Sequence, residues 1–167
     1  RLVRVQEGQD ILGICQGLSA YSDIHVDWIR TIFTGLALVT GGARRLGRAF
    51  AEALAADGLK LAVHYGASGK EAEQVVAAIT RAGGEATAFQ ADLTDVEAAR
   101  SLPGRVVAHF GRLDVLVNSA AVMERIDLAS TTPEYWQRIV DLNLRAPFFL
   151  AQQAAPHLSA TGGTIVN

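Results

Sequence analysis

Short apolar runs alternate with longer amphipathic stretches from residue 36 to residue 167. The apolar runs predict strands at 36–40, 59–64, 86–90, 113–117 and 163–167. The stretches between them have helical spacing and cover about 48–57, 69–82, 95–110 and 133–158. We expect the third helix to be interrupted or restarted at Pro103-Gly104, because proline has no backbone N–H.

This order of elements predicts the α/β class, a doubly wound, Rossmann-like parallel sheet of about five strands with helices on both faces. The predicted sheet is incomplete at its C-terminal end, because the fifth strand is the last element of the sequence. Residues 1–35 do not share the alternation and predict a short N-terminal helical extension. We therefore divide the chain into a helical segment, 1–35, and a Rossmann-type domain, 36–167.

Composition narrows the class of protein further. The 167 residues are 50% hydrophobic, which is enough for a packed core, and the net charge of −2 argues against nucleic-acid binding. Cys15 is the only cysteine, so we expect neither an internal disulfide nor a metal site. The most apolar stretch, 31–43, has 13 residues, whereas a membrane-spanning helix needs about 20. The first ten residues carry four charges, unlike a signal peptide, and we expect a cytoplasmic protein.

The segment Thr40-Gly41-Gly42-Ala43-Arg44-Arg45-Leu46-Gly47 follows a predicted strand and opens a predicted helix. In that context a glycine turn presents backbone N–H groups and a helix N-terminus to a pyrophosphate. The second strand ends at His64-Tyr65-Gly66 without the acidic residue typical of NAD sites. Arg44, Arg45 and Arg48 offer guanidinium groups to a 2′-phosphate instead, so we predict NADP(H). The alternative is that these arginines form only a solvated helix face.

These motifs resemble those of the short-chain dehydrogenase/reductase family. Residues 40–47 are similar to its TGxxxGxG turn, with Arg45 in place of the middle glycine. The Arg-Leu-Gly form of the turn, with His64-Tyr65 after the second strand, is similar to the pteridine-reductase-like branch, which uses NADPH. The resemblance implies a small carbonyl or pterin substrate, and it leaves open whether the chain forms a homo-oligomer.

Three further motifs follow in the family's order. Ala91-Asp92-Leu93 matches the stretch whose Asp contacts adenine, and Asn118-Ser119-Ala120-Ala121 stands where the family has NNAG. Asn143 matches the Asn of the family's catalytic tetrad. The resemblance thus makes Asn143 the candidate catalytic residue, and the candidate cofactor-binding residues are Thr40, Gly41, Arg44, Arg45, Leu46, Gly47, His64, Tyr65, Asp92, Leu93, Asn118 and Ala120.

The remaining catalytic residues of this family, a Ser and a Tyr-x-x-x-Lys motif, follow the strand that corresponds to 163–167. None of Tyr21, Tyr65 and Tyr135 is followed four residues later by Lys. Carbonyl reduction needs a positioned proton donor besides the cofactor. We therefore expect this chain to bind NADP(H) but to be catalytically incomplete.

Residues 1–35 resemble the start of a PspC (phage-shock-protein C) domain, through Ile14–Tyr21 and Val26–Phe33. This resemblance suggests two alternatives to the reductase function. In the first, the chain is a membrane-associated stress-signalling or interaction protein. In the second, it is a chimeric fragment of two incomplete modules without a function of its own. The short apolar run argues against membrane association of the chain in this form.

Overall fold

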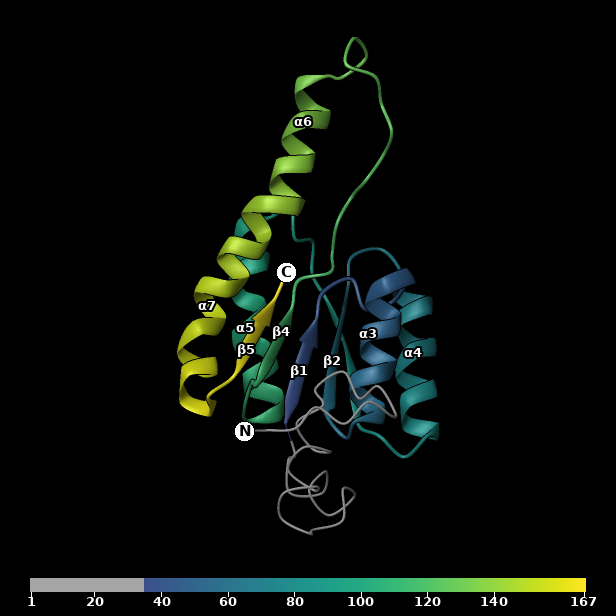
Figure 1. The fold of residues 1–167 in the computed structure, drawn as a ribbon, viewed down its shortest axis with the longest axis vertical. Coiled ribbons are helices and arrows are strands. Elements are labelled where there is room, and N and C mark those ends of the chain that lie inside the picture. The colour runs from purple at the N-terminus through teal and green to yellow at the C-terminus, as the bar shows by residue number, and fades with distance from the viewer. Residues whose placement is uncertain (1–34) are drawn as a thin grey trace, which may run out of the picture.

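The computed structural model describes residues 35–167, which form one parallel sheet with helices on both faces (Figure 1). The strands are β1 (Leu36–Val39), β2 (Lys60–Tyr65), β3 (Ala86–Gln90), β4 (Val115–Val117) and β5 (Thr164–Val166), in the spatial order β3-β2-β1-β4-β5. The helices are α3 (Arg45–Ala56), α4 (Gly69–Arg81), α5 (Val96–Phe110), α6 (Pro133–Val140), the π-helical turn η1 (Asp141–Arg145) and α7 (Ala146–Thr161). The predicted doubly wound class and its five strands are confirmed.

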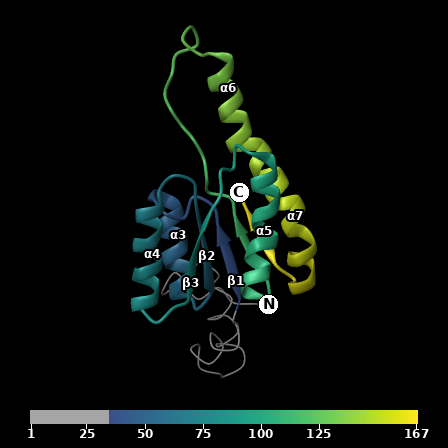
Figure 2. The same cartoon turned by 180° about the vertical axis from the view of Figure 1, so that it is seen from behind.

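The core lies in two layers, one on each face of the sheet. Strand β1 is fully buried and alternates between the layers, with Leu36 and Leu38 on one face and Ala37 and Val39 on the other. The first layer is covered by α5 and α7, which lie side by side (Figure 2), and the second by α3 and α4. A central strand buried on both faces is apolar at every position, as the sequence of β1 shows.

The order of strands reverses at β1, which pairs with β2 on one side and β4 on the other. In a doubly wound sheet, the loops at the carboxyl ends of the strands separate at such a point and leave a crevice for a ligand. The chain thus places the turn after β1 and the segment after β4 next to each other.

Helix α5 runs unbroken from Val96 to Phe110, so the predicted interruption at Pro103 is wrong. The helix begins at Asp95, whose side chain accepts the N–H groups of Glu97 and Ala98, and it ends at Gly111 in the left-handed conformation. Pro103 lies among the buried residues of the helix. The packing of α5 against α7 outweighs the hydrogen bond that the proline cannot make.

The helix predicted at 133–158 is present, but a π-helical turn divides it into α6 and α7. Its start is as expected, because the Thr132 hydroxyl accepts the backbone N–H of Tyr135 and Pro133 occupies the first turn. A π turn contains more residues than an α turn, and such turns occur often at functional sites.

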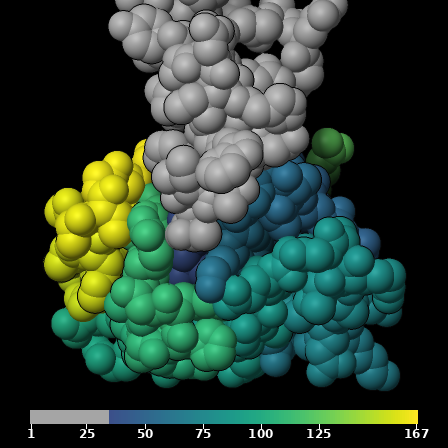
Figure 3. Space-filling view, turned by 90° about the horizontal axis from the view of Figure 1, so that it is seen from below, coloured from purple at the N-terminus to yellow at the C-terminus, as the bar shows by residue number. Residues whose placement is uncertain are grey.

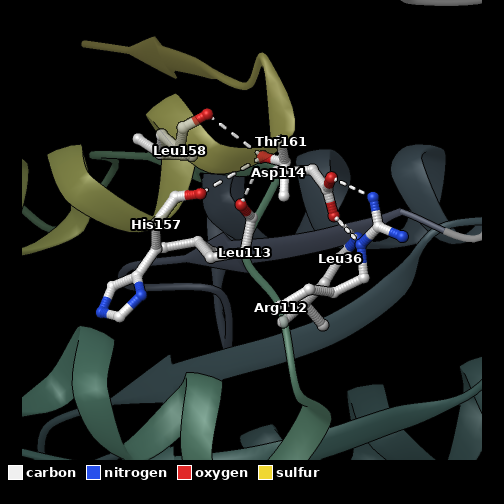
Figure 4. A network of polar contacts seen from close by, with 7 residues as sticks. All are labelled: Leu36, Arg112, Leu113, Asp114, His157, Leu158 and Thr161. Carbon is white, nitrogen blue, oxygen red and sulfur yellow. Dashed lines mark hydrogen bonds and ion pairs between the residues drawn. The ribbon is translucent and has the colours of Figure 1, made fainter.

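At the amino ends of the strands, a polar network connects β1, β4 and α7 (Figure 4). The Asp114 carboxylate accepts the backbone N–H of Leu36 at 2.7 Å and forms an ion pair with Arg112. The Thr161 hydroxyl donates to the carbonyl of Leu113 at 2.9 Å. This network therefore ties the strands together at the end of the sheet opposite to the crevice. Figure 3 views the molecule from that end, with the yellow α7 and the blue α3 on opposite sides.

Strand β5 is the outermost strand described on its side of the sheet. It pairs with β4, and all three of its residues are exposed. The predicted strand at 163–167 is therefore present.

Candidate functional site

An open cleft of about 1270 Å³ lies at the carboxyl ends of the strands. Its walls come from the turn after β1, the ends of β2 and β3, the segment after β4, and α6. Every candidate cofactor-binding residue lines this cleft except Thr40 and Asn118. Candidate residues as far apart in the sequence as Gly41 and Ala120 therefore meet in one place, as the predicted topology requires.

Thr40 is buried beneath the cleft and connects β1 to β4. Its hydroxyl donates to the Val117 carbonyl at 3.2 Å and accepts the backbone N–H groups of Ser119 and Ala120 at 2.9 and 3.0 Å. The side chain is therefore fully used within the protein. Thr40 holds the two sides of the cleft together and does not itself line it.

The turn after β1 needs glycine at two positions. Gly41 has a φ of +65°, and a Cβ there would lie 2.9 Å from the Cα of Ala120. A Cβ on Gly47, in the first turn of α3, would overlap the carbonyl group of Gly41. Glycine at these two positions thus lets the turn pack directly against the segment after β4 and against the first turn of α3.

No side chain caps the N-terminus of α3, so the partial positive charge of the helix dipole there is not neutralised by an acidic residue of its first turn. Arg44 caps the helix in an extended conformation without a side-chain capping bond, and the first turn contains no acidic residue. Arg45 has a φ of +50°, the only positive value among the non-glycine residues that the structure describes. A residue held in this region is strained, which is common at binding sites.

The three arginines predicted to gather here are divided by the structure. Arg44 and Arg45 line the cleft, and the Arg44 guanidinium lies 3.8 Å from the Glu71 carboxylate. Arg48 forms an ion pair with Glu52 at 2.8 Å along the surface of α3 and does not line the cleft. Arg48 fits the solvated helix face that we considered as an alternative, whereas a role of Arg44 and Arg45, which are also exposed, in holding the 2′-phosphate stays a prediction.

His64 is 2% exposed, and both of its ring nitrogens have partners in the protein. Nδ1 lies 3.1 Å from the backbone nitrogen of Gly41, and Nε2 lies 3.1 Å from the carbonyl oxygen of Ala91. Burial lowers the pKa of His64 to about 4. Its neighbour Tyr65 is only half-buried and lines the cleft.

The segment after β3 is shaped by Asp92. Its carboxylate accepts the backbone N–H of Thr94 at 3.0 Å and the Thr94 hydroxyl at 2.7 Å, and these hydrogen bonds lower the pKa of Asp92. Leu93 contributes to the cleft but is itself 4% exposed and packs in the core. The turn therefore presents a charged carboxylate to the cleft above a buried leucine.

Asn118 and Asn143 both use their side chains within the protein. The Asn118 amide donates to the side chain of Asn167 at 2.8 Å, and its own oxygen is buried with no partner among residues 35–167. The Asn143 amide lies in the π turn and pairs with the backbone of Val122, accepting its N–H at 2.9 Å and donating to its carbonyl at 2.8 Å. Asn143 thus fixes the segment after β4, and its catalytic role stays a prediction.

Sequence reasoning missed the wall that α6 contributes. This helix projects beyond the sheet together with the long segment after β4 (Figure 1). A signal was present, because the segment 118–132 is longer than an ordinary connection and such segments often serve function. The lining residues from this wall are Pro133, Glu134, Gln137 and Arg138 of α6, with Asp141 and Leu142 of the π turn.

Two other classes of site were searched for within residues 35–167. No cluster of His, Cys, Asp and Glu side chains in that range has the arrangement of a metal site. None of the helices described has the length and hydrophobicity that crossing a bilayer requires. Cys15 and residues 1–34 of the predicted helical segment 1–35 lie outside the described residues.

Comparison with known proteins finds two matching families. The short chain dehydrogenase profile matches residues 35–167, and the PspC domain profile matches residues 1–46. The profiles share residues 35–46, which form β1 and the glycine turn in this structure.

Individual relatives are similar over the same part of the chain. An uncharacterized oxidoreductase from Methylorubrum extorquens is 44% identical over 132 residues, which are 79% of this chain and 53% of the relative. Hydroxynaphthalene reductase from Aspergillus fumigatus is 43% identical over 78% of this chain and 48% of its own length. The chain thus spans about half the length of the curated relatives it matches.

Solved structures agree with this similarity. A short chain dehydrogenase from Burkholderia cenocepacia, crystallised with NADP, has a TM-score of 0.72 and 42% identity over 74% of this chain and 51% of its own. A short-chain dehydrogenase/reductase from Serratia marcescens has a TM-score of 0.75 and 37% identity over 78% of this chain and 53% of its own.

Proposed function

Because the chain belongs to the short-chain dehydrogenase family, we propose that residues 35–167 are the NADP(H)-binding part of an oxidoreductase. The observation that carries the proposal is the glycine turn after β1. Gly41 and Gly47 let the turn pack against Ala120 and against the first turn of α3, and Gly41 and Gly47 both line the cleft, so the backbone of the turn and the N-terminus of α3 are available to a pyrophosphate. The division into this domain and a separate segment 1–35 is part of the same proposal.

The residues of the cleft fit the other parts of NADP(H). Arg44 and Arg45 would hold the 2′-phosphate, and no carboxylate follows β2 directly, since the strand ends at Tyr65 and Gly66. Asp92 would contact the adenine, and Ala120 lies on the opposite wall. When bound, the nicotinamide supplies hydride transfer, and the chain supplies binding and orientation.

Binding of NADPH and NADH to the 167-residue polypeptide tests this proposal. We expect the Arg44→Ala/Arg45→Ala variant to lose at least about tenfold in affinity for NADPH, the loss typical of charge-assisted hydrogen bonds, and little for NADH. Arg81→Ala, an exposed arginine at the far end of α4, is the matched control. Equal affinities of the double variant and wild type for NADPH would show that Arg44 and Arg45 do not hold the 2′-phosphate.

We also propose that the 167 residues alone do not complete a carbonyl reduction. Tyr135 donates its hydroxyl to the Glu124 carbonyl at 2.8 Å, and Tyr65 lies with its ring against Gly69. Neither is followed by Lys four residues later, so neither has the partner that a catalytic Tyr of this family uses. Steady oxidation of NADPH with a ketone or pterin substrate by the pure polypeptide would contradict this.

A small carbonyl compound is the substrate class that we favour for the whole protein, with a pterin as the alternative. Relatives include a hydroxynaphthalene reductase and a 3-oxoacyl-[acyl-carrier-protein] reductase from Staphylococcus aureus. The Arg45-Leu46-Gly47 turn and His64-Tyr65 instead support the pteridine-reductase-like branch. The thermal stability of the polypeptide with NADP, measured with a ketone and with a pterin added, distinguishes the two substrate classes, because the compound that binds should raise the unfolding temperature.

The PspC match to residues 1–46 supports a second candidate function, association with a membrane or partner protein. In the structure, Leu36–Val39 are fully buried in the sheet, so this segment cannot serve a membrane and the Rossmann-type fold at once. Sedimentation of the polypeptide with lipid vesicles, with and without NADPH, tests whether the two functions exclude each other. Three exposed apolar residues of α6 to α7, Trp136, Leu144 and Phe148, support self-association, which light scattering would measure.

A further inference from the structure

We propose that His64 is a positioning residue, a neutral imidazole that sets the separation between the glycine turn and the Asp92 segment instead of touching the cofactor. This inference rests on the proposed NADP(H) function. It replaces the role in direct cofactor contact that the sequence suggests for His64.

The hydrogen bonds of His64 define one tautomer. Its Nδ1 lies 3.1 Å from the backbone N–H of Gly41, which can only donate, so Nδ1 must be an unprotonated acceptor. The proton then lies on Nε2, which donates to the Ala91 carbonyl 3.1 Å away. Both nitrogens are satisfied, and a positively charged ring would have to give up the bond from Gly41.

The two partners both line the cofactor cleft, in the segments that follow β1 and β3. Gly41 belongs to the turn proposed for the pyrophosphate, and Ala91 directly precedes Asp92, proposed for the adenine. His64 also accepts the N–H of Gly42 through its own carbonyl at 3.0 Å. One residue of β2 therefore fixes the N–H groups of two successive turn residues and the start of the adenine-side segment.

Both nitrogens of this ring are already used within the protein. The residue is 2% exposed, so its nitrogens can neither exchange protons with a substrate nor form hydrogen bonds with a ligand in the cleft. The ring therefore acts through its length. The imidazole connects Gly41 to Ala91, and the cofactor must reach from the one segment to the other. A change in the ring should therefore appear in cofactor affinity as well as in stability.

Two amide variants separate the two bonds. His64→Asn places an amide oxygen near the position of Nδ1 and keeps an acceptor for Gly41, but it does not reach Ala91. His64→Gln reaches Ala91 as a donor, but it offers no acceptor to Gly41. Each variant loses one hydrogen bond and some packing volume, so each serves as the other's control for stability.

We expect His64→Asn and His64→Gln each to lose about tenfold in affinity for NADPH, because each variant breaks one end of the connection and this is the loss expected for one buried hydrogen bond. Affinities of both variants within about threefold of wild type, with both folded, would overturn the proposal. A wild-type chain that fails to bind NADPH would instead overturn the proposed function, so the two failures are distinguishable.

A spectroscopic measurement on the wild-type chain gives an independent test. Long-range ¹H–¹⁵N correlation spectra report which ring nitrogen carries the proton. We expect His64 to be protonated at Nε2 alone, with shifts that stay unchanged from about pH 7.5 to 5.5, because burial holds its pKa at about 4. A ring protonated at Nδ1, or one that gains a second proton in this range, would contradict the assigned role.

Discussion

As the pH falls, protonation linked to His64 should lower the free energy of unfolding before the carboxylates become protonated. Burial is the main cause that lowers the pKa of His64 from 6.5 to about 4; Arg105 lowers it further, while the hydrogen bond to Ala91 partly raises it. The unfolded chain therefore binds a proton that the folded chain does not bind between these two values. Stability from this group is fully present above about pH 6.5 and is lost as the pH falls toward 4.

The size of the effect follows from the two pKa values. By linkage, His64 should remove about 2 kcal/mol from the free energy of unfolding at pH 5 and about 3 kcal/mol at pH 4, relative to neutral pH. Asp92 and Asp127 have lowered pKa values, so their contributions are lost only as the pH falls below the ordinary carboxyl value of 3.8. The window from about pH 7.5 to 5 thus isolates the histidine from these two carboxylates.

Urea unfolding of wild type and His64→Asn at several pH values measures this contribution. The difference between the two free energies of unfolding should shrink by about 2 kcal/mol from pH 7.5 to pH 5, because only wild type carries the titrating ring. Unchanged slopes with urea would show that the two states expose the same surface throughout. A difference that stays constant across this window would refute the buried, neutral state of His64.

Substitutions at three other positions test the close approach in the glycine turn, the helix α5 and the network at the amino ends of the strands. Gly47→Ala should weaken NADPH binding by at least about tenfold, because its Cβ would overlap the carbonyl of Gly41; normal binding by titration would contradict the close approach. Gly104→Ala, inside α5 with nothing near its Cβ, should instead raise the free energy of unfolding by about 1 kcal/mol in urea. Asp114→Ala should lower it by about 2 kcal/mol, because the buried N–H of Leu36 loses its acceptor, whereas Asp114→Asn should keep most of that bond.

The sheet was predictable from the sequence because its central strands carry a strong signal. The four residues of β1 are all apolar, and burial on both faces is what produces such a run. Pro103 shows where local rules are insufficient. A proline predicts a break when the helix is considered alone, but its place in the packed layer between α5 and α7 decides the outcome.

The candidate site was predictable in its positions and less so in its roles. The residues of the glycine turn and the segments after β2, β3 and β4 meet in one cleft because parallel strands end at the same edge. The role of His64 depends on hydrogen bonds to Gly41 and Ala91, which lie 23 and 27 residues away, and no local pattern encodes them. The position of Arg44 depends in the same way on Glu71, 27 residues away, whereas the pair of Arg48 with Glu52 has the i,i+4 spacing that the sequence itself shows.

The π turn makes the number of residues between α6 and α7 as important as their identity. Removing one residue from Asp141–Arg145 would allow an ordinary α-helical turn to form there, without loss of helix. Because the π turn takes up its extra residue in a wider turn, the faces of α6 and α7 would keep nearly the same orientation after the deletion. Gln137 and Glu134 would therefore still face the cleft that they line, whereas the pairing of Asn143 with the backbone of Val122 would be disturbed. A single-codon deletion at this point would therefore keep the sheet and the α6 wall and change only how the segment after β4 is held.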